Sequence, residues 1–115
     1  MAAAEMLATG GAHLYETTGF HCQQATEKYL KAVLLVFGLP VVFTHDLVRL
    51  ILPLQHAGNV HFSAQELADA ATLNEFAVEF RYEIDDAPSF TSVDLLAMAD
   101  RFRAKLRPLA QAFLI

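Results

Sequence analysis

The stretch HCQQATEKYLKA, residues 21–32, predicts one long helix with two contrasting faces. Polar side chains at spacings of three, one and three fall on one face, namely Gln24, Glu27, Lys28 and Lys31. Apolar side chains that we expect to be buried line another face: Ala25, Tyr29, Ala32, Val33 and Val36. Glu27 and Lys31 stand one turn apart, where an exposed ion pair stabilises a helix by roughly 0.2–0.5 kcal/mol.

Helical patterns continue on both sides of this stretch, and no segment alternates at a period of two for long enough to predict a strand. The predicted helices are a short Ala-rich one over residues 1–9, a long one from Thr17 or Thr18 to about Phe37, a third from Thr44 to about His56, a fourth from Ser63 to about Glu83, and a last one from Thr91 or Ser92. Thr44 is the expected N-cap of the third, and Ser63 with Glu66 forms a capping box before the fourth. Pro53 and Pro108 are expected to bend or end the helices that contain them.

Short connections between successive helices favour antiparallel neighbours. We therefore predict an all-α fold, an up-and-down bundle of four main helices plus a short N-terminal helix, in a single domain over residues 1–115. Its core should receive an apolar stripe on the last helix: Leu95, Ala99, Phe102, Leu106, Leu109 and Phe113.

Composition adds an expectation about assembly. Apolar residues make up 55% of the 115 residues and charged residues only 18%, which is more apolar side chain than one small bundle hides. We therefore expect a homodimer or higher oligomer. The segment Leu73–Phe80 is an expected contributor, because Phe76, Val78 and Phe80 would point to different sides of one helix.

Neither a membrane nor an oxidising compartment fits the sequence. The longest apolar run, residues 32–37, is far shorter than the ~18 residues that cross a bilayer, and no basic leader begins the chain. The single cysteine, Cys22, cannot form an internal disulfide and is expected to be a small buried residue. We therefore expect a cytoplasmic protein with no membrane contact.

The charges are unevenly distributed. A net charge of −5 argues against broad nucleic-acid binding. Four of the eight basic residues lie between Arg101 and Arg107, and the other four are Lys28, Lys31, Arg49 and Arg81. If the fold brings the latter four together they form a local anion site, and otherwise they serve as partners for the many carboxylates.

Three motifs, in this order and spacing, resemble the HEPN family of small helical domains. They are a Gln-Gln-Ala-x-Glu-Lys-x-x-Lys-Ala helix over Gln23–Ala32, a Thr-His-Asp-Leu helix start over Thr44–Leu47, and an aromatic-Ala-Val-x-x-Arg-Tyr segment over Phe76–Tyr82. The resemblance runs from about Ala4 to Leu109. It implies a helical bundle that is usually paired into a dimer and is often encoded beside a minimal nucleotidyltransferase.

The resemblance also implies a test for catalysis. Many HEPN proteins are metal-independent ribonucleases, whose motif is an arginine followed by a histidine after four to six intervening residues. Arg81 stands in the matching region, but residues 82–88 read YEIDDAP and supply no histidine to move the proton of a ribose 2′-hydroxyl. Arg49 is followed by His56 after six intervening residues, which is the upper limit of that spacing, but Pro53 stands between them. We therefore expect a non-catalytic domain rather than a ribonuclease of the toxin–antitoxin kind.

Two kinds of function remain open. One is the binding of a nucleotide or phosphate ligand in partnership with a nucleotidyltransferase, and the other is a dimerisation or protein-interaction module without a ligand. The candidate ligand-binding residues are Gln24, Lys28, Lys31, His45, Arg81 and Tyr82. Convergence of the cations on a pocket would favour the first function, and their pairing with a carboxylate such as Glu27 would favour the second. The five histidines lack the spacing of a metal site, so neither a metal nor a cofactor is expected.

Overall fold

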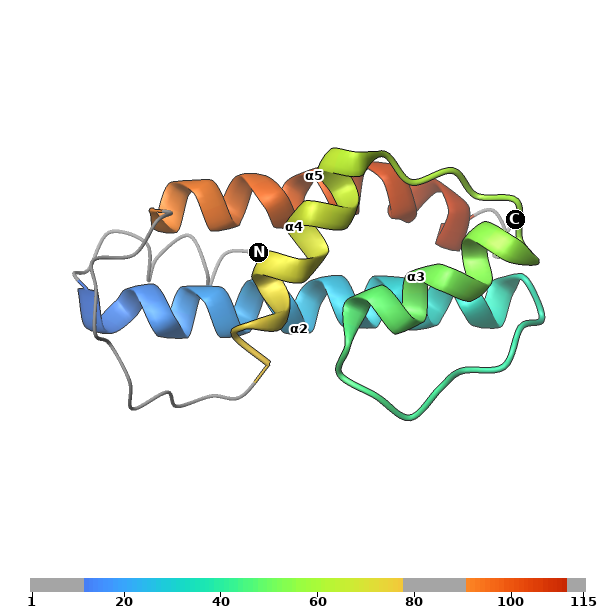
Figure 1. Ribbon diagram of the computed structural model, residues 1–115, viewed down its shortest axis with the longest axis horizontal. Coiled ribbons are helices and arrows are strands. Elements are labelled where there is room, and N and C mark those ends of the chain that lie inside the picture. The colour runs from blue at the N-terminus through green and yellow to red at the C-terminus, as the bar shows by residue number, and fades with distance from the viewer. Residues whose placement is uncertain (1–11, 78–90, 112–115) are drawn as a thin grey trace.

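The computed structural model describes residues 12–77 and 91–111, which form four helices and no strand (Figure 1). The helices are α2 (Ala12–Val36), α3 (Leu47–His56), α4 (Ala64–Asn74) and α5 (Ser92–Gln111). The prediction of an all-α bundle with four main helices is confirmed. The short helix predicted over residues 1–9 lies outside the described residues.

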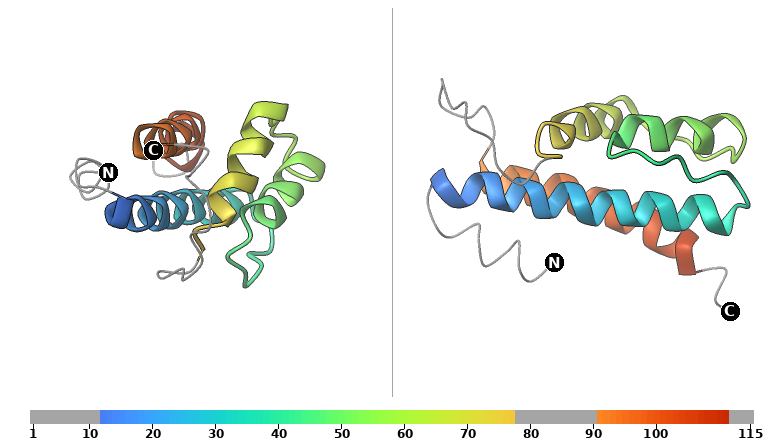
Figure 2. Two further views of the ribbon diagram at one scale, coloured as in Figure 1. Left: turned by 60° about the vertical axis from the view of Figure 1, so that its left-hand side comes forward. Right: turned by 90° about the horizontal axis from the view of Figure 1, so that it is seen from below.

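The helices form two layers. The long helices α2 and α5 lie side by side and run in the same direction, while α3 and α4 pack together across them (Figures 1 and 2). Residues 37–46 first run back along α2, so α3 begins beside the middle of that helix rather than at its end. This connection brings the N-terminus of α3 against the α2 segment that the sequence singled out.

The start of α2 differs from the prediction. The helix begins at Ala12, so Thr17 and Thr18 lie inside it and do not cap it. Thr18 is fully buried. Its end is as predicted. Gly38 adopts φ 69°, and the amide of Leu39 donates to the carbonyl oxygen of Leu34 at 2.9 Å, which closes the last turn.

The buried face of α2 is rotated from the one predicted. Fully or nearly fully buried residues are Cys22, Gln23, Thr26, Glu27, Leu30, Val33 and Leu34, whereas Ala25, Tyr29, Ala32 and Val36 are only partly buried. The prediction was therefore right only for Val33. Its physical fault was to place Glu27 on a polar face away from the core, although Glu27 finds hydrogen-bond partners inside the fold.

Asp46, not the predicted Thr44, is the N-cap of α3. The Asp46 carboxylate accepts from the amide of Val48 at 3.0 Å, while the Thr44 hydroxyl accepts from the amide of Asp46 at 3.1 Å. Asn74, the last residue of α4, adds a second cap, because its side-chain oxygen accepts from the amide of Leu47 at 2.8 Å. Its side-chain amide also donates to Asp46 at 2.7 Å. The end of α3 at His56 is as predicted, with Pro53 inside the helix.

The capping box of Ser63 and Glu66 at the start of α4 is confirmed. The helix ends at Asn74, so the prediction that it continues to about Glu83 is wrong over residues 75–77, and the rest of that stretch lies outside the described residues. The chain turns here because Phe76 packs inward against Gly19 of α2, where any Cβ would overlap its ring.

Phe76 is therefore a core residue. It is 3% exposed, and its ring meets that of Tyr15 edge to face at 5.4 Å between centroids. The expectation that Phe76 contributes to a dimer surface is wrong for this reason. Val78 and Phe80 lie outside the described residues.

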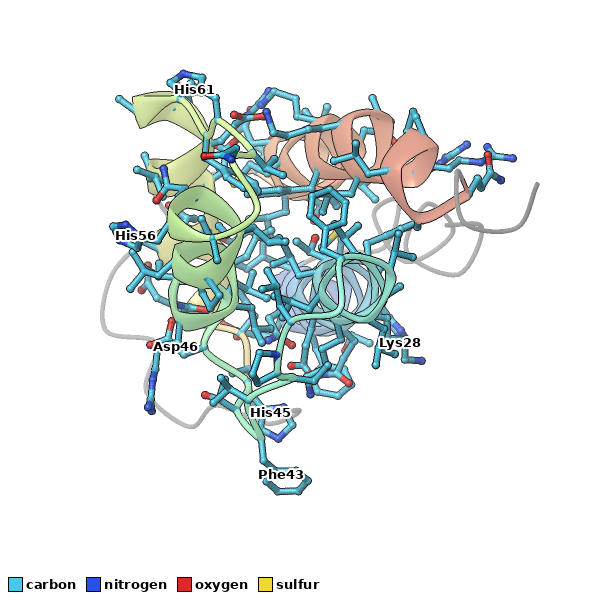
Figure 3. All side chains as sticks on the ribbon, turned by 90° about the vertical axis from the view of Figure 1, so that its right-hand side faces the viewer. Lys28, Phe43, His45, Asp46, His56 and His61 are labelled. Carbon is cyan, nitrogen blue, oxygen red and sulfur yellow. The ribbon has the colours of Figure 1, made fainter. Side chains whose placement is uncertain are left out.

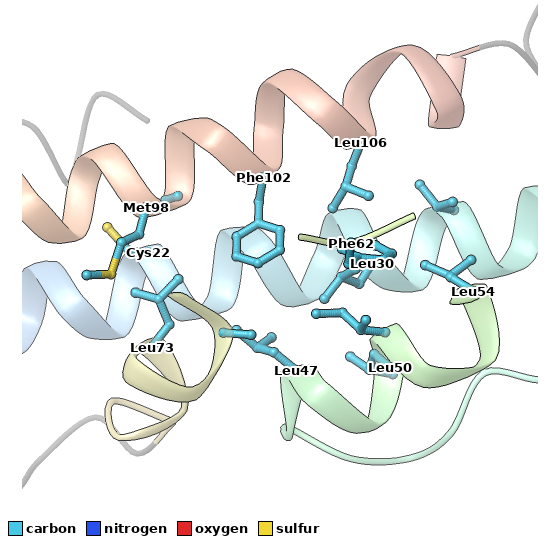
Figure 4. Packing of buried hydrophobic residues seen from close by; sticks show 14 of the residues in the cluster. Cys22, Leu30, Leu47, Leu50, Leu54, Phe62, Leu73, Met98, Phe102 and Leu106 are labelled. Carbon is cyan, nitrogen blue, oxygen red and sulfur yellow. The ribbon is translucent and has the colours of Figure 1, made fainter. Parts of the chain in front are cut away.

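The core lies between the two layers, where α5 contributes its apolar stripe (Figure 4). Leu95, Ala99, Phe102 and Leu106 are buried as predicted, Leu109 is partly buried, and Phe113 lies outside the described residues. Pro108 does not stop the helix, which continues to Gln111. Within residues 12–77 and 91–111, no helix combines the length and the apolarity needed to cross a membrane.

Candidate functional site

A carboxylate lies at the place where α2 meets the connection that leads into α3. Glu27 is only 6% exposed, although it belongs to the stretch that reads as polar in the sequence. His45 faces it from the residue before the N-cap of α3, so His45 lies just outside this helix and not inside it, as the predicted N-cap at Thr44 would place it. Its ring contacts Glu27 of the neighbouring helix α2.

Three side chains bind this carboxylate. Lys31 donates from Nζ to Oε2 at 2.9 Å, and the Nδ1 atom of His45 lies 2.9 Å from Oε1. Gln23 donates from Nε2 to the same Oε1 at 3.1 Å, and also to the backbone oxygen of His45 at 2.8 Å. Gln24 donates in turn to Oε1 of Gln23 at 2.7 Å. We call these five residues the Glu27 cluster.

The cluster keeps Glu27 ionised. Burial by itself raises the pKa of the Glu27 carboxyl, but hydrogen bonds from Lys31, His45 and Gln23 favour the charged form and leave the pKa below its usual value of 4.5. The carboxylate therefore carries its charge at neutral pH and engages the ammonium group of Lys31 directly.

The structure brings only part of the predicted ligand set together. Gln24, Lys31 and His45 belong to the Glu27 cluster, whereas Lys28 points away into solvent (Figure 3) and has no hydrogen bond or ion pair with any described residue. Arg81 and Tyr82 lie outside the described residues. Lys31 pairs with Glu27, as their one-turn spacing predicted, and its ammonium group is therefore engaged by a carboxylate of the protein.

Sequence reasoning missed Gln23 as a member of the site. Its side chain is fully buried and connects α2 to the backbone before α3. A signal was present, since Gln23 and Glu27 stand four residues apart, where a glutamine amide reaches a carboxylate on the same helix face. The partner at His45 is distant in sequence, and no local pattern points to it.

The basic residues of α5 form no comparable site. Arg101 holds the buried Asp69 with two hydrogen bonds of 2.8 and 3.0 Å, and that hydrogen bonding raises the pKa of the guanidinium. Lys105 pairs with Glu66 at 3.3 Å and also lies 4.9 Å from the centroid of the Phe62 ring. Arg101 and Lys105 therefore pair with carboxylates of α4.

Cys22 is confirmed as a buried core residue. Burial, with a smaller contribution from the charge of Asp100, raises the pKa of its thiol to about 12, so it carries no thiolate at neutral pH. Among the residues that the structure describes, no group of three or more histidine, cysteine or acidic side chains is placed to hold a metal ion. The chemistry of the described site is therefore that of a buried hydrogen-bond cluster.

Comparison with known proteins identifies the family. No curated protein and no solved structure matches the chain. The family described as HEPN domain matches residues 1–106, which include all of α2, α3 and α4 and most of α5. Since the match covers nearly the whole sequence, the chain belongs to the HEPN domain family.

Proposed function

We propose that this HEPN domain is a non-catalytic binding module that acts through contacts with protein chains, as a homodimer and with a nucleotidyltransferase partner. The observation that carries the proposal is the ion pair inside the Glu27 cluster. The Nζ atom of Lys31 lies 2.9 Å from the carboxylate of Glu27, whose side chain is only 8% exposed, so the charge of Lys31 is paired within the fold.

The ion pair between Lys31 and Glu27 disfavours the competing function, which is nucleotide or phosphate binding. A phosphate that approached Lys31 would also approach the buried negative charge of Glu27, which would repel it. Lys28 is exposed and uncommitted among the described residues, but one solvated lysine gives an anion only about 1 kcal/mol of attraction or less. The cluster is better suited to fixing residues 37–46 on α2 than to holding a ligand.

Nucleotide titration tests this directly. Calorimetric titration of the full chain with ATP, GTP and inorganic phosphate up to millimolar concentrations should show no binding. Arg81→Ala and Lys28→Ala are the variants to compare if binding appears. A binding signal that either variant removes, with thermal unfolding unchanged, would contradict the proposal and establish the nucleotide site instead.

The proposal also requires that the chain not cleave RNA. His45 is engaged with Glu27 through Nδ1, and no histidine follows Arg81 at the ribonuclease spacing. Purified protein incubated with single-stranded RNA should leave it intact. Cleavage that disappears in both Arg81→Ala and His45→Ala would show a catalytic HEPN domain with an unusual arrangement of its groups.

Assembly is the positive test. Sedimentation at tens of micromolar should give the mass of a dimer. Co-expression with a minimal nucleotidyltransferase of the same genome should give a complex that co-elutes in size exclusion. A chain that is monomeric and forms no complex with the nucleotidyltransferase would refute the proposal.

A further inference from the structure

An exposed aromatic side chain stands next to the Glu27 cluster. Phe43 is 102% exposed, the largest value among the large apolar side chains of the described residues, and it points away from the protein on the side where Lys28 and His45 also lie (Figure 3). Val41, two residues earlier, and Leu35, on the last turns of α2, are also exposed. A group of large apolar side chains exposed on one part of a protein is typical of a binding surface.

The backbone that carries Phe43 is held on both sides. Before it, the Gly38 turn ends α2. After it, the amide of Thr44 donates to the oxygen of Val42 at 2.9 Å, and Gln23 donates to the oxygen of His45 at 2.8 Å. An aromatic residue on a fixed backbone loses little conformational entropy when a partner covers it, which favours binding.

The charges around Phe43 indicate the chemistry of that partner. Lys28 and Leu35 stand seven residues apart on α2, so they share one exposed helix face. Arg49, one turn beyond the N-cap of α3, is exposed too. Neither Lys28 nor Arg49 pairs with a carboxylate among the described residues, on a chain whose net charge is −5. A local positive rim on an acidic protein is complementary to an acidic surface.

We propose that Phe43, with Val41 and Leu35, is the apolar anchor that docks a different protein through a surface of apolar side chains edged by carboxylates. The carboxylates pair with Lys28 and Arg49. A second copy fits less well, because a two-fold contact over this face would bring the positively charged rims of both protomers into one interface. The inference rests on the proposed function and names the surface and the partner chemistry that it uses.

A displayed random-peptide library, selected on the full chain, tests the partner chemistry. The enriched sequences should combine large apolar residues with Asp or Glu. Binding of the synthesised consensus peptide, followed by fluorescence anisotropy, should weaken by at least about tenfold in Phe43→Ser and in Lys28→Glu, and it should weaken with added salt.

Matched controls separate this surface from general effects. Val93→Ser removes another exposed apolar side chain, and Arg107→Glu reverses another exposed charge, so both should stay within about twofold of the wild type. Thermal unfolding should be the same for wild type and Phe43→Ser, because the ring is fully exposed.

Four results would overturn the inference. One is enrichment of no peptides, or of peptides without acidic residues. Another is a peptide affinity that Phe43→Ser leaves unchanged. The third is a dimer that Phe43→Ser converts to a monomer, which would make a second copy the occupant. A complex with the nucleotidyltransferase that survives Phe43→Ser would refute this surface while leaving the proposed function in place.

Discussion

Replacing Glu27 with alanine removes the carboxylate on which three donors converge, and it should lower the free energy of unfolding by about 2–3 kcal/mol. Removing one partner of a fully buried ion pair costs roughly 3–5 kcal/mol, because the other charge is stranded. Here the side chains of Lys31 and His45 are 27% and 66% exposed, so water takes over part of their solvation when Glu27 is lost. Gln23 keeps its bond to the backbone of His45. The expected loss therefore lies below the fully buried limit.

Equilibrium unfolding in urea, followed by circular dichroism at neutral pH, measures this difference. Asp100→Ala is the matched control, because its carboxylate is 62% exposed and lies 3.6 Å from Arg103. That exposed pair should contribute less than about 1 kcal/mol. A double-mutant cycle of Glu27→Ala with Lys31→Ala then isolates the ion pair itself. A cost for Glu27→Ala no larger than that for Asp100→Ala would refute the view that the cluster fixes the connection to α2.

Three further predictions concern stability. Gly19→Ala should destabilise the protein by about 1–3 kcal/mol, because its methyl group overlaps the Phe76 ring, and a smaller side chain at Phe76 should recover part of the lost melting temperature. Asp69→Ala should cost about 2–3 kcal/mol in urea unfolding, since Asp69 is 1% exposed and receives both bonds of Arg101, whose own 45% exposure keeps the cost below the fully buried limit, and a loss below about 1 kcal/mol would contradict the buried pairing. The folded pKa of Glu27 lies below its usual 4.5, so its contribution is fully present above pH 4.5 and is lost as the pH falls through the lower folded value. Unfolding measured against pH should therefore show an acid-side loss in the wild type that is smaller in Glu27→Gln.

The sequence predicted those parts of the fold that depend on local chemistry. The capping box of Ser63 and Glu66 uses groups a few residues apart, so its pattern is visible in the chain. Thr91 and Asp94 form the same reciprocal hydrogen bonds before α5, at 2.8 and 3.1 Å. The periodic spacing of apolar residues likewise predicted the buried stripe of α5.

The parts that were wrong depend on contacts between distant residues. The α2 face was misplaced because Glu27 is buried against His45, which is eighteen residues away. The early end of α4 follows from the packing of Phe76 on Gly19, across most of the chain. A helical pattern records which residues are apolar, but it does not record which polar groups find a partner in the folded state.

The sequence predicted some residues of the candidate site, but not what those residues do in the fold. Gln24, Lys31 and His45, three of the six predicted ligand-binding residues, lie together in the Glu27 cluster. Their interpretation as ligand-binding groups relied on spacing alone, which places Lys31 near Glu27 without deciding whether the lysine is free for an anion. The exposure of Phe43 could not be read from the sequence either, because an aromatic residue in an apolar segment is ordinarily expected in the core.

The bridge from Asn74 to the start of α3 couples the opening of the two short helices. Asn74 ends α4, and its side chain also satisfies the amide of Leu47 and contacts Asp46, so α4 cannot unwind at its C-terminus without uncapping its neighbour. In hydrogen exchange, slow amides in α3 and α4 should therefore open together as one cooperative unit. Because Asp46 follows directly on His45, that unit is anchored to the helix that carries Glu27, and its fluctuations reach the backbone that presents Phe43.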